Sequence, residues 1–137
     1  MTDTMKLEIV TPDGVAYTGD AQLVTMPAVD GQIGVFAHHM PLLTRILPGE
    51  ILVRTAAGAE EVLAVGEGLV SVTANHVGIV TDMAIEAKNI DEARVEEARQ
   101  RALARLRDKI SDEEVATVNA SLARSLAQLK VKRRRRT

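Results

Sequence analysis

The sequence predicts an α+β fold in which an all-β N-terminal domain, a sandwich or barrel of short strands, is followed by a C-terminal two-helix antiparallel hairpin. Two observations predict it. All nine Gly and all four Pro lie between Pro12 and Gly78, so the rest of the chain lacks both helix-breaking residues. The hydrophobic period also changes, from two residues in the first part to three or four after Lys88. We therefore expect two domains, residues 1–88 and 89–137.

Short apolar and β-branched runs, each bounded by turn residues, predict the strands of the first domain. The first run ends at Pro12-Asp13-Gly14 and the second at Pro27. Later runs are separated by pairs such as Pro48-Gly49 and Ala57-Gly58. In order, the runs cover residues 7–11, 22–26, 42–47, 51–54, 61–65, 69–73 and 77–81. Turns at such short intervals are typical of sandwiches and barrels.

A helical stripe follows the strands. Apolar side chains recur three or four residues apart, at Val95, Ala98, Ala102, Leu106 and Ile110. Asp91, just before this stripe, is a suitable N-cap because its carboxylate can accept hydrogen bonds from the free N–H groups of the first turn. We therefore predict a helix that begins beside Asp91.

A second helical stripe completes the chain. It consists of Val115, Val118, Leu122, Leu126 and Leu129. Ser111 and Glu114 fit a capping box at its start. Because only about two residues separate the helices, they must fold back on each other. Their facing surface is largely Ala, which contributes little burial free energy, so the hairpin could open.

Composition excludes several classes of protein. The 137 residues, 46% hydrophobic and 26% charged, suit one ordinary domain or one small domain with an appendage. The absence of Cys excludes disulfides, thiolate zinc sites and Cys nucleophiles. No apolar run approaches the roughly 18 residues of a membrane span, and no signal-peptide pattern opens the chain. We expect a soluble, intracellular protein.

The net charge of −2 conceals a separation of charge. Residues 1–88 carry −7 and residues 89–137 carry +5. The basic residues are densest at the end of the chain, in Lys130, Lys132 and Arg133 to Arg136. A basic arm on an acidic body suggests an anionic partner for the arm.

The basic run has three interpretations: a solvated helix end that suits the helix dipole, a contact with an acidic protein, or a nucleic-acid-binding tail. Nucleic-acid binding is the weakest of these, because Tyr17 and Phe36 are the only aromatic residues available for base stacking.

No catalytic constellation is evident. His38 and His39 are adjacent and would point to opposite faces of a strand, and His76 lies in a predicted turn. None has carboxylate partners at the spacing that a metal site or a general base requires. The glycines of residues 31–34 and 66–68 lack the strand-to-helix context of phosphate-binding loops. We expect a protein that is not an enzyme on its own.

Four sequence blocks follow one another along the chain, and their order identifies a family more specifically than any single block does. They are DGQIGVFAHHMPLLT at residues 30–44, Pro48-Gly49, IDEAR at residues 90–94 and LAQLKV at residues 126–131. Together they resemble the epsilon subunit of bacterial F-type ATP synthases, over nearly the whole chain.

The resemblance implies a sandwich of about ten strands followed by the two-helix hairpin. It also implies a non-catalytic subunit of the rotating central stalk, which links the gamma subunit to the c-subunit ring. The hairpin would act as a brake that, when extended, meets an acidic loop of the beta subunits and blocks ATP hydrolysis. Such a protein would be peripheral, on the cytoplasmic face of the bacterial inner membrane, and membrane-associated through the complex alone, with no nucleic-acid partner.

The resemblance also assigns interface residues. Asp30, Gly31 and Gln32 correspond to a loop that faces the c ring. The block near gamma contains His39, Pro41, Leu42 and Leu43, although Leu42 and Leu43 could equally belong to the core. The contact with the acidic beta-subunit loop would use cations of the second helix, Arg124, Lys130, Lys132, Arg133, Arg134, Arg135 and Arg136.

Some members of the resembled family bind regulatory ATP through an Ile-Asp-x-x-Arg-Ala motif at the folded hairpin. Ile90, Asp91 and Arg94 match it, and Val95 replaces the Ala. The alternatives are an N-cap role for Asp91 and a surface position for Arg94. No cofactor is required, and ATP would be a regulatory ligand. A free-standing nucleotide sensor remains a further hypothesis.

Overall fold

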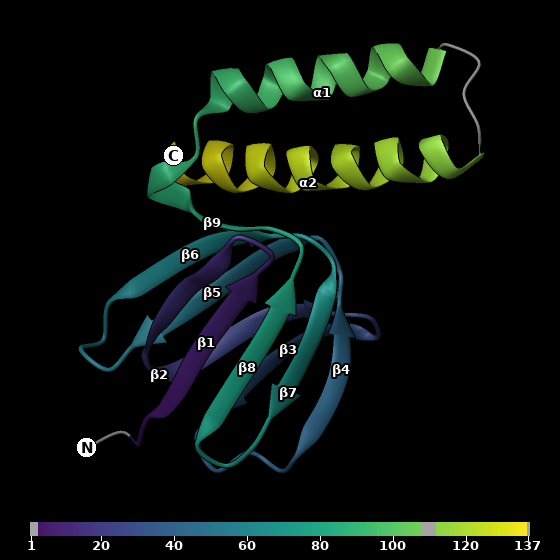
Figure 1. The fold of residues 1–137 in the computed structure, drawn as a ribbon. Coiled ribbons are helices and arrows are strands. Elements are labelled where there is room, and N and C mark those ends of the chain that lie inside the picture. Colours follow the sequence, from purple (N-terminus) through teal and green to yellow (C-terminus); the bar gives the residue numbers. More distant parts are fainter. Residues whose placement is uncertain (1–2, 108–111, 137) are drawn as a thin grey trace.

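The computed structural model describes residues 3–107 and 112–136. Within them, nine strands precede a short 3-10 helix and two long helices (Figure 1). The strands are β1 (Met5–Thr11), β2 (Gly14–Ala28), β3 (Gly31–Phe36), β4 (Leu42–Ile46), β5 (Gly49–Thr55), β6 (Glu60–Val65), β7 (Gly68–Val72), β8 (His76–Thr81) and β9 (Ala84–Glu86). The helices are η1 (Ala87–Asn89), α1 (Glu92–Arg107) and α2 (Asp112–Arg136).

Strand β2 joins the two layers of the sandwich. The hydrogen-bonded order is β1-β8-β7-β4-β2-β5-β6-β9, with β3 on β2 and a further pairing of β1 with β2. The first half of β2, up to Ala21, pairs with β1, whereas β2 pairs with β5 from Ala21 and with β3 from Leu23. The register of β2 against β5 is irregular between Ala21 and Leu23, close to where β2 leaves β1. A β-bulge bends a strand in this way.

The predicted sandwich followed by a hairpin is confirmed, with differences of detail. The structure has β3, β9 and the first half of β2 where no strand was expected, because these segments contain glycines and polar residues or are only three residues long. One pairing, β1 with β8, is parallel, while the others are antiparallel. The described strands number nine, close to the ten implied by the resemblance.

The sandwich core follows strand alternation. In β1, Met5, Leu7 and Ile9 are buried while Lys6 is exposed. The same alternation in the other strands builds one cluster, which also contains Ala21, Val24, Met26, Val35, Ile46, Ile51, Val53, Leu63, Val65, Val70, Val72, Val77 and Ile79.

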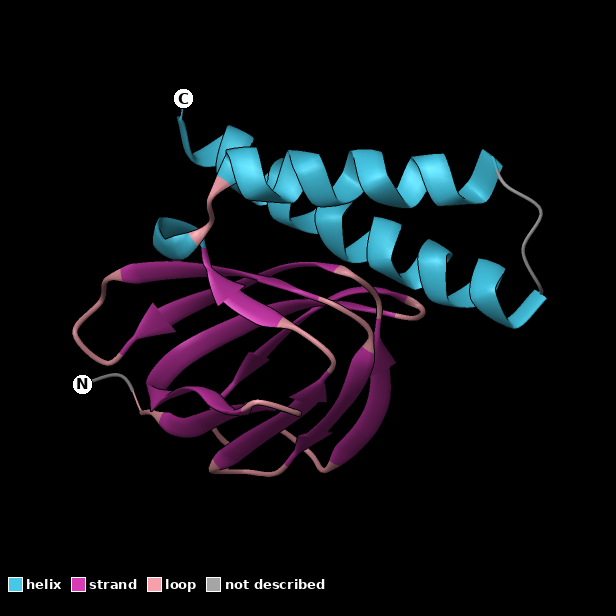
Figure 2. Ribbon diagram, turned by 45° about the horizontal axis from the view of Figure 1, so that its top comes forward, coloured by secondary structure: helices cyan, strands magenta, loops and turns pink. Residues whose placement is uncertain are grey.

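Strand β6 is buried on both faces because the hairpin covers its outer side. Its apolar run is continuous: Leu63 and Val65 point into the sandwich core, whereas Val62 and Ala64 belong to a second cluster with Ile90 and Val131. Figure 2 shows the two helices lying together over one side of the sandwich. Helix α2 contacts β5, β6 and η1, and α1 packs on α2. The hairpin is therefore folded down on the sandwich.

The helical stripes are confirmed in part. Ala102, Val118 and Leu129 are buried as expected, but Leu126 is 51% exposed. Ser125, Ala127 and Val131 are buried in α2 instead. The expected single stripe fails because α2 packs against α1 on one side and against the sheet on another. Ile110 and Ser111, and with Ser111 the predicted capping box, lie outside the described residues.

Candidate interaction surfaces

The β2–β3 turn exposes Asp30, Gly31 and Gln32. Ala28 pairs with Gly31, so Val29 and Asp30 form a two-residue turn. Gly31 has φ 125°, a conformation that residues with a Cβ rarely adopt. The sequence therefore places a protruding acidic turn at one edge of the sandwich.

The start of β4 distinguishes the two interpretations of Leu42 and Leu43, core or contact. Leu42 is half-buried and packs against the sandwich core, whereas Leu43 points outward and is 73% exposed. Pro41 is exposed and His39 is half-buried, with its Nδ1 donating to the Met40 carbonyl at 2.6 Å. Alternation along the strand thus makes Leu42 a core residue and leaves Leu43 available for contact.

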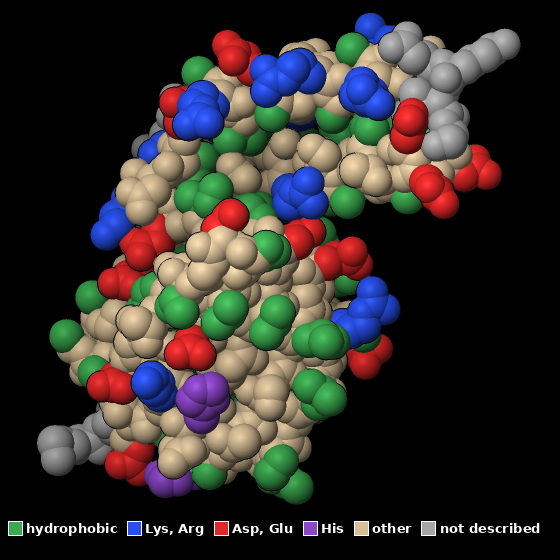
Figure 3. All heavy atoms as spheres, viewed as in Figure 1, with side chains coloured by type: hydrophobic (Ala, Val, Ile, Leu, Met, Phe, Trp, Pro, Cys, Tyr) green, Lys and Arg blue, Asp and Glu red, His purple; other side chains and the backbone are tan. Residues whose placement is uncertain are grey.

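An apolar row crosses the outer face of β1, β8 and β7 and reaches the start of β2. Strand register places Val15 beside Val10, Val10 beside Val80, and Val80 beside Leu69. Val15, Val80 and Leu69 are exposed, and the hairpin packs on β5 and β6 instead. Hydrophobic side chains form a row across this face in Figure 3. We call Val15, Val10, Val80 and Leu69, with the nearby Leu43, the outer apolar row.

The cations predicted to meet an acidic partner contact this chain in the folded state. Arg124 Nη1 lies 3.1 Å from Asp82 Oδ2, and Arg134 Nη1 lies 2.8 Å from Glu50 Oε2. Lys132 Nζ donates to the Ala87 carbonyl of η1 at 3.4 Å.

The other predicted cations differ in their surroundings. Arg133 lies 3.5 Å from Glu92 and 3.6 Å from Glu96, both on α1. Lys130 is exposed. The side chains of Arg135 and Arg136 lie outside what the structure describes. The end of α2 therefore contacts α1 and η1 as well as the sandwich.

Glu96 is the centre of a small polar network at the start of α1. Gln100 Nε2 and Arg99 Nη1 each donate to its Oε1 at 3.0 Å. These groups hold the pKa of Glu96 below its ordinary value, chiefly through the Gln100 hydrogen bond, with Arg99 and Arg133 adding attraction. The ionised carboxylate thereby links α1 to the end of α2.

The three residues of the nucleotide motif lie together, in different roles. Asp91 Oδ1 accepts hydrogen bonds from the N–H groups of Ala93 at 3.1 Å and Arg94 at 3.3 Å, so it caps α1. Ile90 is only 5% exposed and belongs to the second cluster, against which Val95 also packs. The Val at this position therefore has a packing role.

A cavity of about 330 Å³ adjoins this motif. Ile90, Asp91, Arg94 and Arg101 line it from one side, with Ser125 and Gln128 of α2 among the other lining residues. The two arginines could pair with phosphate oxygens, although Glu97 also lines the cavity and opposes an anion. The two arginines therefore fit a nucleotide phosphate, whereas Glu97 does not.

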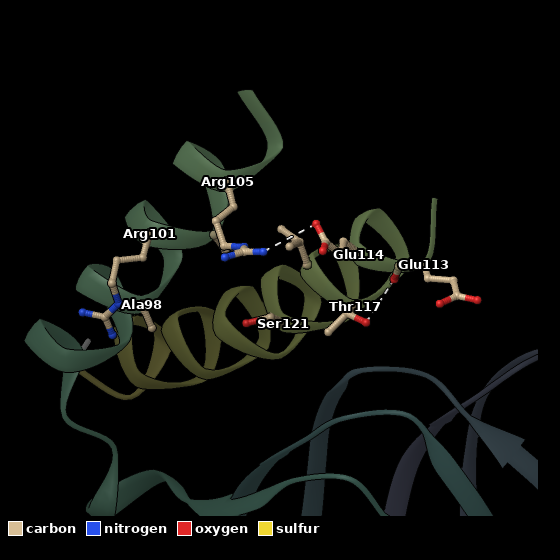
Figure 4. A pocket seen from close by; sticks show the side chains of 9 residues that line it. Ala98, Arg101, Arg105, Glu113, Glu114, Thr117 and Ser121 are labelled. Carbon is tan, nitrogen blue, oxygen red and sulfur yellow. Dashed lines mark hydrogen bonds and ion pairs between the residues drawn. The ribbon is translucent and has the colours of Figure 1, made fainter. Parts of the chain in front are cut away.

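A larger cavity of about 600 Å³ lies between the helices towards the hairpin tip (Figure 4). Arg101 and Arg105 line it from α1, and Glu113, Glu114 and Thr117 from α2. Arg105 lies 3.7 Å from Glu114, so opposite charges face each other across the opening. Sequence reasoning missed this space, because it depends on how far two Ala-rich helices separate.

Other chemistry is limited among the residues that the structure describes. They contain no group of three His, Cys, Asp or Glu side chains that could hold a metal ion. His38 Nε2 lies 2.8 Å from Asp3 Oδ2, with both side chains largely exposed. Neither described helix combines the length and apolar character needed to cross a bilayer.

Comparison with known families identifies relatives of both parts of the chain. Residues 4–87 match the family described as "ATP synthase, Delta/Epsilon chain, beta-sandwich domain". Residues 88–133 match "ATP synthase, Delta/Epsilon chain, long alpha-helix domain".

Individual relatives are similar over almost their full length. The ATP synthase epsilon chain of Laribacter hongkongensis is 38% identical over 93% of this chain and 91% of its own. That of Chromobacterium violaceum is also 38% identical, over 92% and 91%.

Two solved structures share the fold. A chain of the Euglena gracilis mitochondrial ATP synthase structure aligns with a TM-score of 0.73 at 19% identity, over 93% of this chain and 79% of that chain. A chain of the Tetrahymena thermophila central stalk and c-ring structure aligns with 0.65 at 13% identity, over 96% and 98%.

Proposed function

This chain belongs to the ATP synthase delta/epsilon family, and from that membership we propose that it is the epsilon subunit of a bacterial F-type ATP synthase. In this role it has no active site of its own. It links the gamma subunit to the c ring within the rotating central stalk, and its hairpin can inhibit ATP hydrolysis. The observation that carries the proposal is the match of both parts of the chain to the family, and the outer apolar row, on a part of the sandwich that the hairpin leaves uncovered, supports a docking contact.

The outer apolar row is the proposed gamma interface. Exposed apolar side chains that are contiguous across several strands mark interaction surfaces more often than isolated ones do. Leu43, Leu69 and Val80 are all more than half exposed. Pro41 and His39 lie at the edge of the same segment, so they belong to the proposed contact, while Leu42 contributes from the core side.

The protruding turn of Asp30, Gly31 and Gln32 is the proposed contact with the c ring. Its support is geometric: the turn is exposed and its conformation is determined by Gly31. A two-residue turn held by the Ala28–Gly31 pair loses less conformational entropy on binding than a long loop, which suits a contact that must transmit torque.

Co-elution tests the stalk assignment. The purified chain and the gamma subunit should elute together from size-exclusion chromatography at micromolar concentration. Leu69→Glu should weaken the complex, because it places a charge within the outer apolar row, beside Val80. Leu126→Glu is the matched control, since Leu126 is 51% exposed and Leu69 53%, but Leu126 lies on α2. Separate elution of the two wild-type proteins would contradict the assignment.

The brake role is tested by deletion. We propose a sandwich domain of residues 1–88 and a hairpin domain of residues 89–137, supported by the end of β9 at Glu86 and the start of α1 at Glu92. Removal of residues 89–137 should raise ATP hydrolysis by the assembled enzyme and leave assembly intact. Unchanged hydrolysis would mean that the hairpin has no inhibitory role in this protein.

In the extended state, the cations of α2 are the proposed contacts with the acidic loop of the beta subunits. Arg124, Lys130, Lys132 and Arg133 to Arg136 supply charge along the last turns of α2, where Arg suits pairing with carboxylates. In the folded state several of them contact this chain instead, which supports their role in a change between two states.

Regulatory ATP is a second, separate proposal, favoured by the cavity beside Ile90, Asp91 and Arg94. Arg94 and Arg101 would hold the phosphates, while Asp91 retains its cap. Calorimetry with ATP should show binding to the wild type and weaker binding to Arg94→Ala. Equal heats of ATP binding for the two proteins would mean that Arg94 is a surface residue that does not contact ATP.

The proposed location is the cytoplasmic face of the bacterial inner membrane, reached through the complex. A nucleic-acid-binding tail was the alternative function. The folded structure disfavours it, because the Arg124, Arg133 and Arg134 side chains lie against carboxylates of this chain. Salt-dependent DNA binding that is lost on removal of residues 133–136 would instead support the nucleic-acid-binding function.

A further inference from the structure

Two ion pairs join α2 directly to the sandwich. Arg124 meets Asp82 near the middle of the helix, and Arg134 meets Glu50 near its end. The carboxylates come from separate parts of the sandwich, the β8–β9 turn and the start of β5. Two attachment points along one helix restrain its direction as well as its position.

The sandwich is shaped to present both carboxylates. A Cβ on Gly66 would overlap the Asp82 carboxylate, so glycine at this position leaves the space that Asp82 occupies. The Glu50 side chain is 15% exposed and lies in a groove of about 440 Å³ together with Lys130 and Arg134. Partial burial reduces solvent screening, which strengthens the attraction between Glu50 and Arg134.

We propose that Asp82 and Glu50 form a latch that holds the hairpin down by occupying cations that an acidic partner would otherwise bind. The inference rests on the proposed brake function for its partner, the acidic loop. The latch and the acidic partner compete for the same two arginines. Arg124 and Arg134 cannot pair with the sandwich and with a distant acidic surface at once, so the chain's own carboxylates set a threshold for release of the hairpin.

The latch is weak enough to be reversible. Exposed ion pairs contribute modestly to stability, so each of these pairs should shift the closed-to-open ratio about two- to five-fold. Salt should oppose the latch, because the screening length falls from about 10 Å at 0.1 M to about 3 Å at 1 M ionic strength. Among the residues that the structure describes, the apolar cluster of Val62, Ala64, Ile90 and Val131 and the hydrogen bond from Lys132 to the Ala87 carbonyl would still attach the hairpin.

Native-state hydrogen exchange on the isolated full-length chain measures the latch, because it detects rare openings. The variant Asp82→Asn with Glu50→Gln should lower the protection of α2 amides about ten-fold, with β7 amides unchanged. At 1 M salt the difference from wild type should largely disappear. Unchanged α2 protection at low salt would overturn the proposal, as would an equal loss in β7.

A matched control separates the latch from general charge effects. Glu8→Gln with Asp20→Asn makes the same two chemical changes on β1 and β2 and alters the net charge equally. It should change α2 protection less than about two-fold. A double-mutant cycle of Asp82→Asn and Arg124→Gln should be non-additive, because either change breaks the same pair. Additive effects would contradict the Arg124–Asp82 contact as the cause.

Competition is tested with an Asp- and Glu-rich peptide, followed by fluorescence anisotropy. The peptide should bind the Asp82→Asn, Glu50→Gln variant about five-fold or more tightly than the Glu8→Gln, Asp20→Asn control. Equal affinities would show that the two carboxylates do not compete for the cations. These measurements use the isolated chain, so failure of the latch is distinguishable from failure to co-elute with gamma.

Discussion

Asp91 shows how a motif residue acquires its role from local geometry. Its carboxylate accepts two N–H groups of the first turn of α1, as the sequence predicted for an N-cap. The same residue belongs to the motif that the family resemblance connects with ATP. Capping uses Oδ1, and the motif's Ile90 is buried beneath the helix start, so the local structure explains both residues without a ligand.

Asp91→Ala should lower the free energy of unfolding by about 1 kcal/mol, because two N–H groups lose their acceptor. Urea denaturation followed by circular dichroism measures the change. Asp91→Asn is the control, since it retains a capping oxygen without the negative charge and should be nearly neutral. If Asn destabilises as much as Ala, charge and not capping is what Asp91 contributes.

Glu96 predicts a dependence on pH. Its pKa is held below the ordinary 4.5 in the folded state, so the unfolded chain takes up a proton first as the pH falls. The stability that Glu96 contributes is therefore present above about pH 4.5 and is lost as the pH falls through the lower folded pKa. Glu96→Gln should flatten the pH profile of unfolding below pH 4.5, as measured by urea denaturation at a series of pH values.

Helix α2 shows that the partners of an element select its buried face. The 3.6-residue period predicted Leu122, Leu126 and Leu129 on one stripe. In the structure Leu129 is 2% exposed and Leu126 is outside the contact, because α2 is enclosed by α1 and the sheet from two directions. Two small residues, Ser125 and Ala127, are buried in α2 instead.

Leu129→Ala should destabilise the protein by about 2–4 kcal/mol, since it removes a buried side chain and leaves a cavity. Leu126→Ala should change stability by less than about 0.5 kcal/mol, because its side chain is half in solvent. Chemical denaturation of the two variants makes the comparison. Similar losses for both would mean that Leu126 packs more closely than its exposure indicates.

Strand β6 could be recognised from its run of Val62 to Val65, which is typical of a strand buried on both faces. Strand β3 could not, because Gly31, Gln32 and Gly34 have low strand propensity. It forms because β2 offers an unpaired edge directly after a two-residue turn. Pairing, and not the composition of the segment, makes it a strand.

For the whole molecule, the hairpin and the sandwich share an apolar contact reinforced by ion pairs. The second cluster joins Val62 and Ala64 of β6 to Ile90 and Val131, residues far apart in sequence. The interface is small compared with the sandwich core, so the two parts should separate without unfolding the strands.

A fragment of residues 1–88 should therefore retain its strand circular dichroism but bind more of a hydrophobic dye than the full chain, because Leu52, Val62 and Ala64 become uncovered. A Val62→Ser change in the fragment should reduce the extra dye binding. Loss of cooperative unfolding in the fragment would show that the sandwich requires the hairpin for its stability.

The order and type of the main elements, the N-cap, the charge separation and the core of β1 follow from the sequence, because they depend on local propensity and on hydrophobic period. The parallel β1–β8 pair, the exposure of Leu126 and the partners of the α2 cations follow from the tertiary structure. Arg134 and Glu50 are 84 positions apart, and no local pattern connects them. Contacts of this kind exist only after the hairpin folds onto β5 and β6, where packing selects which charges meet.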